Sequence, residues 1–206
     1  ARGTVIRNNY LHHIQGVGSL GSQGIYLDDQ ASGIQVMGNI FNEVRYAIFV
    51  GGGRDNLIQG NLFVHCPMSV TLDARGLGDQ KRDVENPSSG LRQALSKVPY
   101  RQGSYLKYPG LASVLEDAPG APKGNRIIGN IAVGGAGFDV KAAAKPFVEV
   151  ARNLTSGAIF RWPERLQPGF PHGVRDFELN PAGPAGTIGF QPIPLDRIGP
   201  GSTPNR

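Results

Sequence analysis

Three short segments of the sequence share one pattern of apolar residues and recur at almost constant spacing. They are GIYLDD at 24–29, AIFVGG at 47–52 and SVTLDA at 69–74. The pair Ile25 and Leu27 has counterparts 23 and then another 22 residues later (48 − 25 = 23; 70 − 48 = 22). Alternation with a period of two is typical of a strand with one buried face, and repeats in the low twenties are typical of a β-solenoid. We therefore expect three neighbouring parallel strands, one from each repeat.

A second recurring segment has an asparagine between apolar residues. The asparagine spacings are 30, 22, 69 and 23 residues (39 − 9, 61 − 39, 130 − 61, 153 − 130), and the residues are Asn9, Asn39, Asn61, Asn130 and Asn153. Two spacings equal one repeat, the spacing of 30 indicates a short insertion around 16–23, and the spacing of 69 indicates a long one. We expect these asparagines to turn the corner between strands and their amides to hydrogen-bond from repeat to repeat.

The repeats divide the chain into parts. We expect repeats over 1–157, interrupted by an insertion at 76–124, and a C-terminal cap and tail at 158–206 whose prolines block further strand pairing. Apolar spacing within the insertion predicts short helices at 91–98 and 111–117.

The first repeat is already under way at Thr4. A solenoid needs its open end covered, and no covering segment precedes this residue in the sequence. We therefore expect the chain to be the C-terminal part of a longer protein, whose missing N-terminal part would be its partner.

Charge and composition narrow the classes of partner. The net charge of +5 and the pI near 9.6 fit a nucleic acid, an anionic membrane or an acidic polymer. The basic residues are scattered and no nucleic-acid motif accompanies them, so no nucleic-acid partner is expected. No apolar run approaches the length of a membrane span, so no membrane partner is expected either. The single cysteine, Cys66, excludes an internal disulfide and is expected in the core.

The corner pattern G-N-x-F, at 38–41 and 60–63, resembles that of the right-handed parallel β-helix superfamily, which includes pectate lyases and polygalacturonases. The segments GIYLDD, LDARG (72–76) and GFQPIP (189–194) further resemble the C-terminal half of secreted bacterial β-helix proteins related to glycoside hydrolase family 141. The resemblance implies an all-β, right-handed parallel β-helix with a partly helical insertion. It also implies fucosidase or xylanase activity on plant cell-wall glycans and an extracellular or periplasmic location.

Asp28 and Asp73 occupy the same position in repeats that lie two apart, with Gly51 between them. Strands about 4.8 Å apart place these residues roughly 10 Å apart at Cα. That distance is nearer to the about 6.5–9.5 Å of inverting glycosidases than to the about 5–5.5 Å of retaining ones. We expect the pair to be acid and base, in an order left open, with Gly51 leaving room for a sugar and a water. Asp29 and Glu43 are reserve candidates.

The alternative interpretation of the two aspartates is structural. Aspartates at strand ends commonly accept hydrogen bonds from backbone N–H groups of the following turn. The residue type and position fit both interpretations, and the sequence alone does not choose between them.

A row of His13, Glu43 and His65 follows the corner asparagines at a constant distance of four residues. Such a row could tune a carboxylic acid or hold a metal ion. It could equally be a solvated polar row in which a carboxylate lies between two imidazoles. We list the histidines as substrate-binding candidates and assign no metal site.

Two aromatic and two basic residues complete the candidates for substrate binding. Tyr26 and Phe49 could stack on sugar rings or pack beneath the insertion. Arg54 and Arg75 could bind a uronate carboxylate, or simply pair with Asp55 or Asp73. In the functional interpretation, the insertion forms one wall of a cleft beside Asp73.

We expect a carbohydrate-active enzyme that hydrolyses glycosidic bonds in a cell-wall-type polysaccharide with two carboxylates and no cofactor. One alternative is a polysaccharide lyase that abstracts a proton next to a uronate with Arg75 or a lysine, with calcium at the aspartates. The other is a non-catalytic protein that binds glycans or has a structural role.

Overall fold

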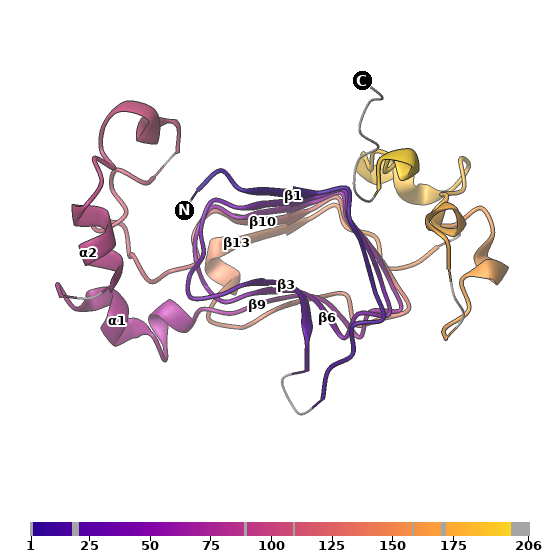
Figure 1. The fold of residues 1–206 in the computed structure, drawn as a ribbon, viewed down its shortest axis with the longest axis horizontal. Helices are drawn as coiled ribbons and strands as arrows, with labels where there is room; N and C mark the ends of the chain where they lie inside the picture. The colour runs from indigo at the N-terminus through magenta and orange to yellow at the C-terminus, as the bar shows by residue number, and fades with distance from the viewer. Residues whose placement is uncertain are drawn as a thin grey trace, which may run out of the picture.

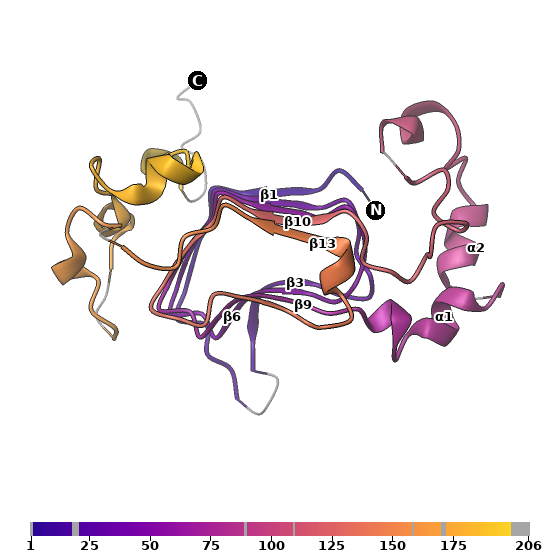
Figure 2. The same cartoon turned by 180° about the vertical axis from the view of Figure 1, so that it is seen from behind.

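Three parallel β-sheets form the body of the protein (Figures 1 and 2). The computed structural model describes residues 2–17, 21–88, 90–108, 110–157, 159–169 and 172–198. The strand orders are β1-β4-β7-β10-β13 in the first sheet, β2-β5-β8-β11 in the second and β3-β6-β9-β12 in the third. Neighbours in each sheet are three strands apart in the sequence, so the chain passes through all three sheets in every repeat.

The strands are short, and those of the third sheet include the longest. The first sheet comprises β1 (Val5–Arg7), β4 (Gln35–Met37), β7 (Leu57–Gln59), β10 (Asn125–Ile128) and β13 (Val148–Ala151). The second sheet comprises β2 (Tyr10–His12), β5 (Ile40–Asn42), β8 (Leu62–Val64) and β11 (Ile131–Val133). The third sheet comprises β3 (Gln23–Leu27), β6 (Tyr46–Val50), β9 (Met68–Leu72) and β12 (Phe138–Val140).

The register of the third sheet aligns the recurring apolar positions. Ile25 pairs with Ile48, Ile48 with Val70, and Val70 with Phe138, all in parallel ladders. The predicted alignment of the three key segments is therefore confirmed, and β12 after the insertion continues it as a fourth strand. This register leaves the residues of opposite parity, beginning with Tyr26, on the outer face of the sheet.

The space enclosed by the three sheets is filled by the inward-facing apolar side chains. The rings of Phe41 and Phe63 stack inside it with centroids 5.0 Å apart. Cys66 belongs to the same core, as expected, and burial raises the pKa of its thiol to about 11. Burial on this scale is the main source of stability in a chain with such short strands.

The corner between the first and second sheets is held by the predicted asparagine ladder. Asn39, Asn61 and Asn130 are fully buried. The side-chain oxygen of Asn61 accepts hydrogen bonds from the backbone N–H and the side-chain amide of Asn39, both at 3.0 Å. The side-chain amide of Asn61 in turn donates to Asn130 Oδ1 at 3.0 Å and to the carbonyl of Val36 at 2.8 Å.

A second, shorter asparagine ladder lies before the first sheet and was not predicted. The backbone N–H of Asn56 donates to Asn125 Oδ1 at 2.9 Å, and the amide of Asn125 donates to the carbonyl of Gly53 at 2.9 Å. Asn56 and Asn125 are 69 residues apart in the sequence, so their pairing does not show the spacing of one repeat. It fastens the chain on its return from the insertion to the preceding repeat.

The helices lie mainly in the insertion and in the C-terminal segment. The α-helices are α1 (Lys81–Glu85) and α2 (Gly90–Ser96). The 3-10 helices are η1 (Arg75–Leu77), η2 (Gly103–Lys107), η3 (Lys145–Phe147), η4 (Pro163–Arg165), η5 (Val174–Phe177), η6 (Pro184–Ile188) and η7 (Leu195–Arg197). The predicted helix at 91–98 corresponds to α2, whereas the helix predicted at 111–117 is wrong, because turns occupy those residues. Within the described ranges, no helix combines the length and the apolar character needed to cross a bilayer.

The fold class predicted from the sequence is wrong. Of the described residues, 20% are helical and 26% lie in strands, so the chain has three parallel sheets with helices and a mixed α/β character. An all-β, right-handed parallel β-helix is not shown. Helices of three to five residues are too short to show an apolar periodicity, so the sequence pattern does not predict them. The strand repeats therefore dominated the prediction.

The C-terminal segment covers the outer face of the second sheet. Phe160, Phe177 and Phe190 belong to one apolar cluster with Ile40 and Leu62 of that sheet. Figures 1 and 2 show this segment and the insertion on opposite sides of the sheets. Positions 18–20 of the predicted short insertion, and 158, 170, 171 and 199–206 of the predicted cap and tail, lie outside the described residues.

Replacing Asn61 by alanine should destabilise the protein by about 2–4 kcal/mol. The change removes the acceptor of the buried Asn39 N–H and one donor to the Val36 carbonyl, whereas Asn130 Oδ1 keeps the backbone N–H of residue 61. Each unpaired buried group costs about 1–3 kcal/mol. Urea denaturation followed by circular dichroism would measure the loss. Asn9→Ala is the matched control, because Asn9 lies at the end of the ladder, and a loss as large as that of Asn61→Ala would contradict the explanation.

Candidate functional site

Arg75 connects the two aspartates that the sequence proposed as a catalytic pair. Its Nη1 donates to Asp28 Oδ1 at 2.6 Å, and its Nη2 donates to Asp73 Oδ2 at 3.0 Å. The Nε group lies 3.2 Å from both oxygens of Asp73. The structure thus brings Asp28 and Asp73 together, as expected, but through a shared guanidinium.

Gly51 lies between the aspartates, as the register predicted, and the space above it is filled. A Cβ atom added to Gly51 would lie 2.5 Å from Cζ of Arg75. The expectation that Gly51 leaves room for a sugar and a water is therefore wrong in this arrangement. The glycine instead makes room for the Arg75 side chain.

The contacts of Asp28 favour its ionised form. Partial burial raises the pKa of the carboxyl. The hydrogen bonds from Tyr26 and from the Asp29 N–H, together with the charge of Arg75, lower this pKa by more, so the pKa of Asp28 is below its ordinary value. Burial also lowers the pKa of Arg75, but the hydrogen bonds to Asp73 and Tyr26 outweigh it, so the pKa is raised and the guanidinium stays charged. A general acid must hold a proton near the working pH, so Asp28 is unsuited to that role here.

Aromatic rings flank the Arg75 guanidinium on the outer face of the third sheet. The rings of Tyr26 and Phe49 lie 5.1 Å apart, and Cζ of Arg75 lies 5.8 Å and 5.4 Å from their centroids. The Tyr26 hydroxyl also accepts a hydrogen bond from Arg75 Nη1 at 3.1 Å. Tyr26 remains 42% exposed, so its ring is open to a ligand.

The side chains of Asp29 and Arg54 contact the insertion rather than this cluster. Asp29 accepts a hydrogen bond from Gln80 of the insertion at 2.7 Å. Arg54 is buried and donates to the carboxylate and the carbonyl of Asp117, each at 2.6 Å. The hydrogen bond of Lys123 and then that of Arg54 hold the pKa of Asp117 below its ordinary value. The predicted pairing of Arg54 with Asp55 is replaced by this contact with the insertion.

His13, Glu43 and His65 lie in one row, as predicted. What they share is a left-handed backbone conformation with positive φ. These residues have φ of 54°, 53° and 51°. His13 Nε2 lies 3.7 Å from Glu43 Oε1, which also accepts a hydrogen bond from the N–H of Gly169 at 3.0 Å. His65 Nε2 lies 2.7 Å from the carbonyl of Leu166. The row thus forms a left-handed corner and fastens the C-terminal segment.

The part of the chain that the structure describes contains no cluster of side chains suited to bind a metal ion. No group of three or more histidine, cysteine, aspartate or glutamate side chains there is placed to hold an ion. The expectation that no cofactor is needed therefore stays a prediction.

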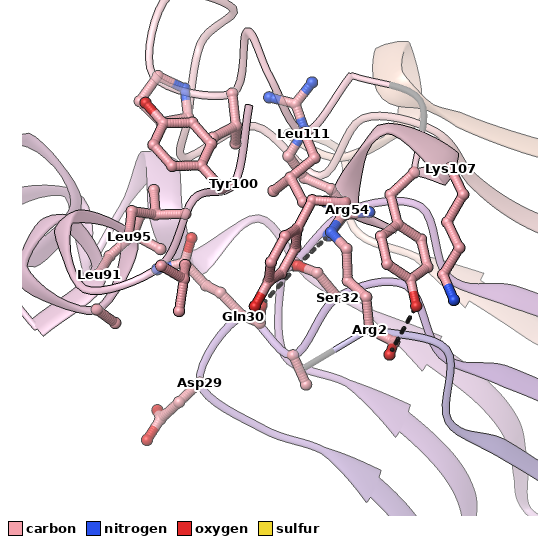
Figure 3. A pocket seen from close by; sticks show the side chains of 18 of the residues that line it. Arg2, Asp29, Gln30, Ser32, Arg54, Leu91, Leu95, Tyr100, Lys107 and Leu111 are labelled. Atoms are coloured by element: carbon pink, nitrogen blue, oxygen red, sulfur yellow. Dashed lines mark hydrogen bonds between the residues drawn. The ribbon is translucent and has the colours of Figure 1, made fainter. Parts of the chain in front are cut away.

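A cleft of about 720 Å³ lies between the insertion and the edge of the sheets (Figure 3). The sheets contribute Arg2, the turn at 29–32 and Arg54. The insertion contributes the apolar side chains of α2 and three tyrosines, Tyr100, Tyr105 and Tyr108. The predicted cleft wall from the insertion thus exists, but the cleft is lined by Asp29 and not by Asp73. A volume of this size is within the usual range of about 300–1,000 Å³ for ligand sites.

The residues that line the cleft include more basic than acidic side chains, although two of the basic side chains are ion-paired with carboxylates outside the lining. Three cations, Arg2, Arg54 and Lys107, line it together with one carboxylate, Asp29, which gives +3 − 1 = +2. The partners of Arg2 and Arg54 are Asp55 and Asp117, which are not lining residues. Figure 3 shows Arg2 and Lys107 at one end of the cleft, with Asp29 directed away from the other labelled side chains.

Lys107 is the cation of the cleft most open to a ligand. Its Nζ lies 5.1 Å from the ring centroid of Tyr108. Among the described residues, no carboxylate forms an ion pair with it. Sequence reasoning missed Lys107 and the three tyrosines as site residues, although their density within 100–108 was a usable signal.

Comparison of the chain with models of protein families, with curated proteins and with solved structures found no match. Family membership, and with it the predicted relation to glycoside hydrolases, therefore stays a prediction.

Replacing Arg75 by methionine should raise the pKa of Asp28 toward its ordinary value. The ionised Asp28 stabilises the folded chain above the pKa that it has when unfolded, and this contribution is lost as the pH falls through the folded-state pKa. The variant should therefore lose less stability between pH 7 and acidic pH than the parent does. Carboxyl NMR titration and denaturation at both pH values measure the two effects.

The control for this change is Arg126→Met. Arg126 forms an exposed ion pair with Glu149 on the first sheet, at 2.8 Å. The control should leave the titration of Asp28 unchanged. An unchanged pKa of Asp28 in Arg75→Met would show that the guanidinium does not control this carboxyl.

Proposed function

We propose that this protein binds an acidic polysaccharide, with one stretch of the sugar chain in the cleft between the insertion and the sheets. The observation that carries the proposal is the lining of the cleft, where three tyrosines lie with Lys107, a cation that forms no ion pair among the described residues, unlike Arg2 and Arg54. The basic balance of the whole chain, +5, acts in the same direction.

The chemistry of sugars fits this lining. Tyrosine combines an apolar ring face, which suits the C–H face of a sugar ring, with a hydroxyl that can bond to sugar hydroxyls. Gln30 and Ser32, in the turn of the sheets, add further polar groups to the cleft. Lys107 offers a charge-assisted hydrogen bond to a carboxylate or sulfate of the polymer, and Arg2, whose charge is paired with Asp55, lies at the same end of the cleft. Such a ligand is expected where the resemblance also points, in the extracellular space or the periplasm.

Hydrolysis of the bound polymer by Asp28 and Asp73 stays a prediction. The pair shares Arg75, and the contacts of Asp28, including that with Arg75, hold its pKa below the ordinary value, which does not suit a general acid. The exposed ring of Tyr26 beside this cluster offers a second point of contact for a long sugar chain. The proposal therefore assigns binding to the cleft and leaves catalysis to a direct test.

Binding is tested by replacing Lys107 with methionine. We expect affinity for acidic polysaccharides, such as polygalacturonate and glucuronoxylan, to fall roughly tenfold, because one charge-assisted contact is lost. Affinity electrophoresis and calorimetry on matched acidic and neutral polymers measure this effect.

Lys97→Met is the matched control for this experiment. Lys97 is exposed on the insertion and does not line the cleft. Failure of the parent protein to bind any acidic polymer would reject the proposed function. Equal losses in the two variants would assign the effect to overall charge rather than to the cleft.

Catalysis is tested with Asp28→Asn and Asp73→Asn on the same polymers. A two-carboxylate hydrolase should release reducing ends without ultraviolet absorbance, and each variant should lower the rate by at least about a hundredfold. Absorbance from unsaturated uronates would identify a lyase. Binding without either product would leave the protein as a glycan-binding protein, and normal turnover in both variants would exclude the aspartate pair.

A further inference from the structure

Helix α2 presents an apolar face to the cleft. Leu91, Ala94 and Leu95 of α2, and Val98 just after its end, follow the spacing of one helical face, and all four line the cavity. No residue of α2 is buried, and Leu91 and Val98 are each 36% exposed. Amphipathic helices in proteins normally bury such a face, so in this structure it has no described cover.

The opposite side of the cleft is polar. It consists of the turn at 29–32, with the side chains of Asp29, Gln30 and Ser32, and of Arg54. Figure 3 shows Leu91 and Leu95 across the cleft from Arg2 and Lys107. A ligand that fills the cleft must therefore be polar and anionic on one side and apolar on the other.

A bare sugar chain satisfies only part of this lining. The tyrosines suit sugar rings, but sugar hydroxyls placed against aliphatic side chains lose water without gaining hydrogen bonds, which costs free energy. A short apolar group attached to the sugar would instead bury its surface against Leu91 and Leu95. Each methyl or methylene group buried in this way favours binding, because apolar surface is removed from water.

We propose that the cleft recognises an acidic glycan that carries acyl ester groups, with the acyl group against the apolar face of α2 and the anionic group at Lys107 and Arg2. This inference rests on the proposed function, because it names the chemical class of the polysaccharide. The cationic end of the cleft argues for a glycan ligand over an uncharged apolar one.

The experiment compares one oligosaccharide with and without its acyl groups. The probes are O-acetylated glucuronoxylan oligosaccharides and O-acetylated oligogalacturonates, each before and after mild alkaline de-acetylation. This treatment removes acetate, restores an uncharged hydroxyl and leaves the uronate carboxylates unchanged. The parent protein should bind at least one acetylated probe roughly three- to tenfold more tightly than its de-acetylated form by calorimetry.

Substitutions in α2 test whether its face is responsible. The variant Leu91→Gln/Leu95→Gln should lose the preference for the acetylated form and keep its affinity for the de-acetylated form. Glutamine supports a helix, and neither leucine is buried, so the fold should survive. Leu95→Met should retain the preference, and so should Leu106→Gln, since Leu106 is 65% exposed and does not line the cleft.

The outcomes separate this inference from the proposed function. Equal affinity of the parent protein for both forms of each probe, or a preference that persists in the double glutamine variant, would overturn the acyl-ester inference alone. No binding of either form would reject the proposed function as well. Self-association that the double variant abolishes, measured by analytical ultracentrifugation, would assign the face to a second copy of the chain and also overturn the inference.

Discussion

The structure depends on parallel pairing in register between successive repeats. Each strand is too short to be stable alone, and its backbone groups are satisfied by the equivalent strands of neighbouring repeats. A shift by one residue would turn the apolar row of Ile25, Ile48 and Val70 outward and expose it to water. The buried amides of Asn39 and Asn61 oppose such a shift, because they find their partners only in the native register.

The same register places the residues of the two candidate sites. It aligns Asp28, Gly51 and Asp73 on the outer face of the third sheet, where Arg75 reaches back across the glycine to both aspartates. It also aligns the turns that form the polar side of the cleft. The insertion adds the other side, and Arg54 with Asp117 ties it to the frame. A repetitive frame thus supports a site built from one irregular segment.

The repeats could be predicted from the sequence because they are local patterns that recur. The apolar pairs at Ile25 and Ile48 and the corner asparagines each depend on a few neighbouring residues, and the structure confirms their alignment. The mixed class of the fold could not be predicted, because 3-10 helices leave no periodic trace. The pairing of Arg75 with Asp73 was among the alternatives from the sequence, but the connection that Arg75 makes to Asp28 could not be predicted. This contact spans 47 residues and depends on the side-chain conformation of the arginine.

The insertion lies at a corner of the fold where the length of the chain can change without disturbing the sheets. The chain leaves the third sheet after β9 and returns at β10, which pairs with β7 of the preceding repeat in the ordinary register. The departure and the return therefore lie one ordinary corner apart, although 69 − 22 = 47 additional residues separate them. Lengthening a loop whose ends are already fixed adds little entropic cost. Insertions of different length and specificity can consequently replace one another at this corner while the three sheets keep their structure.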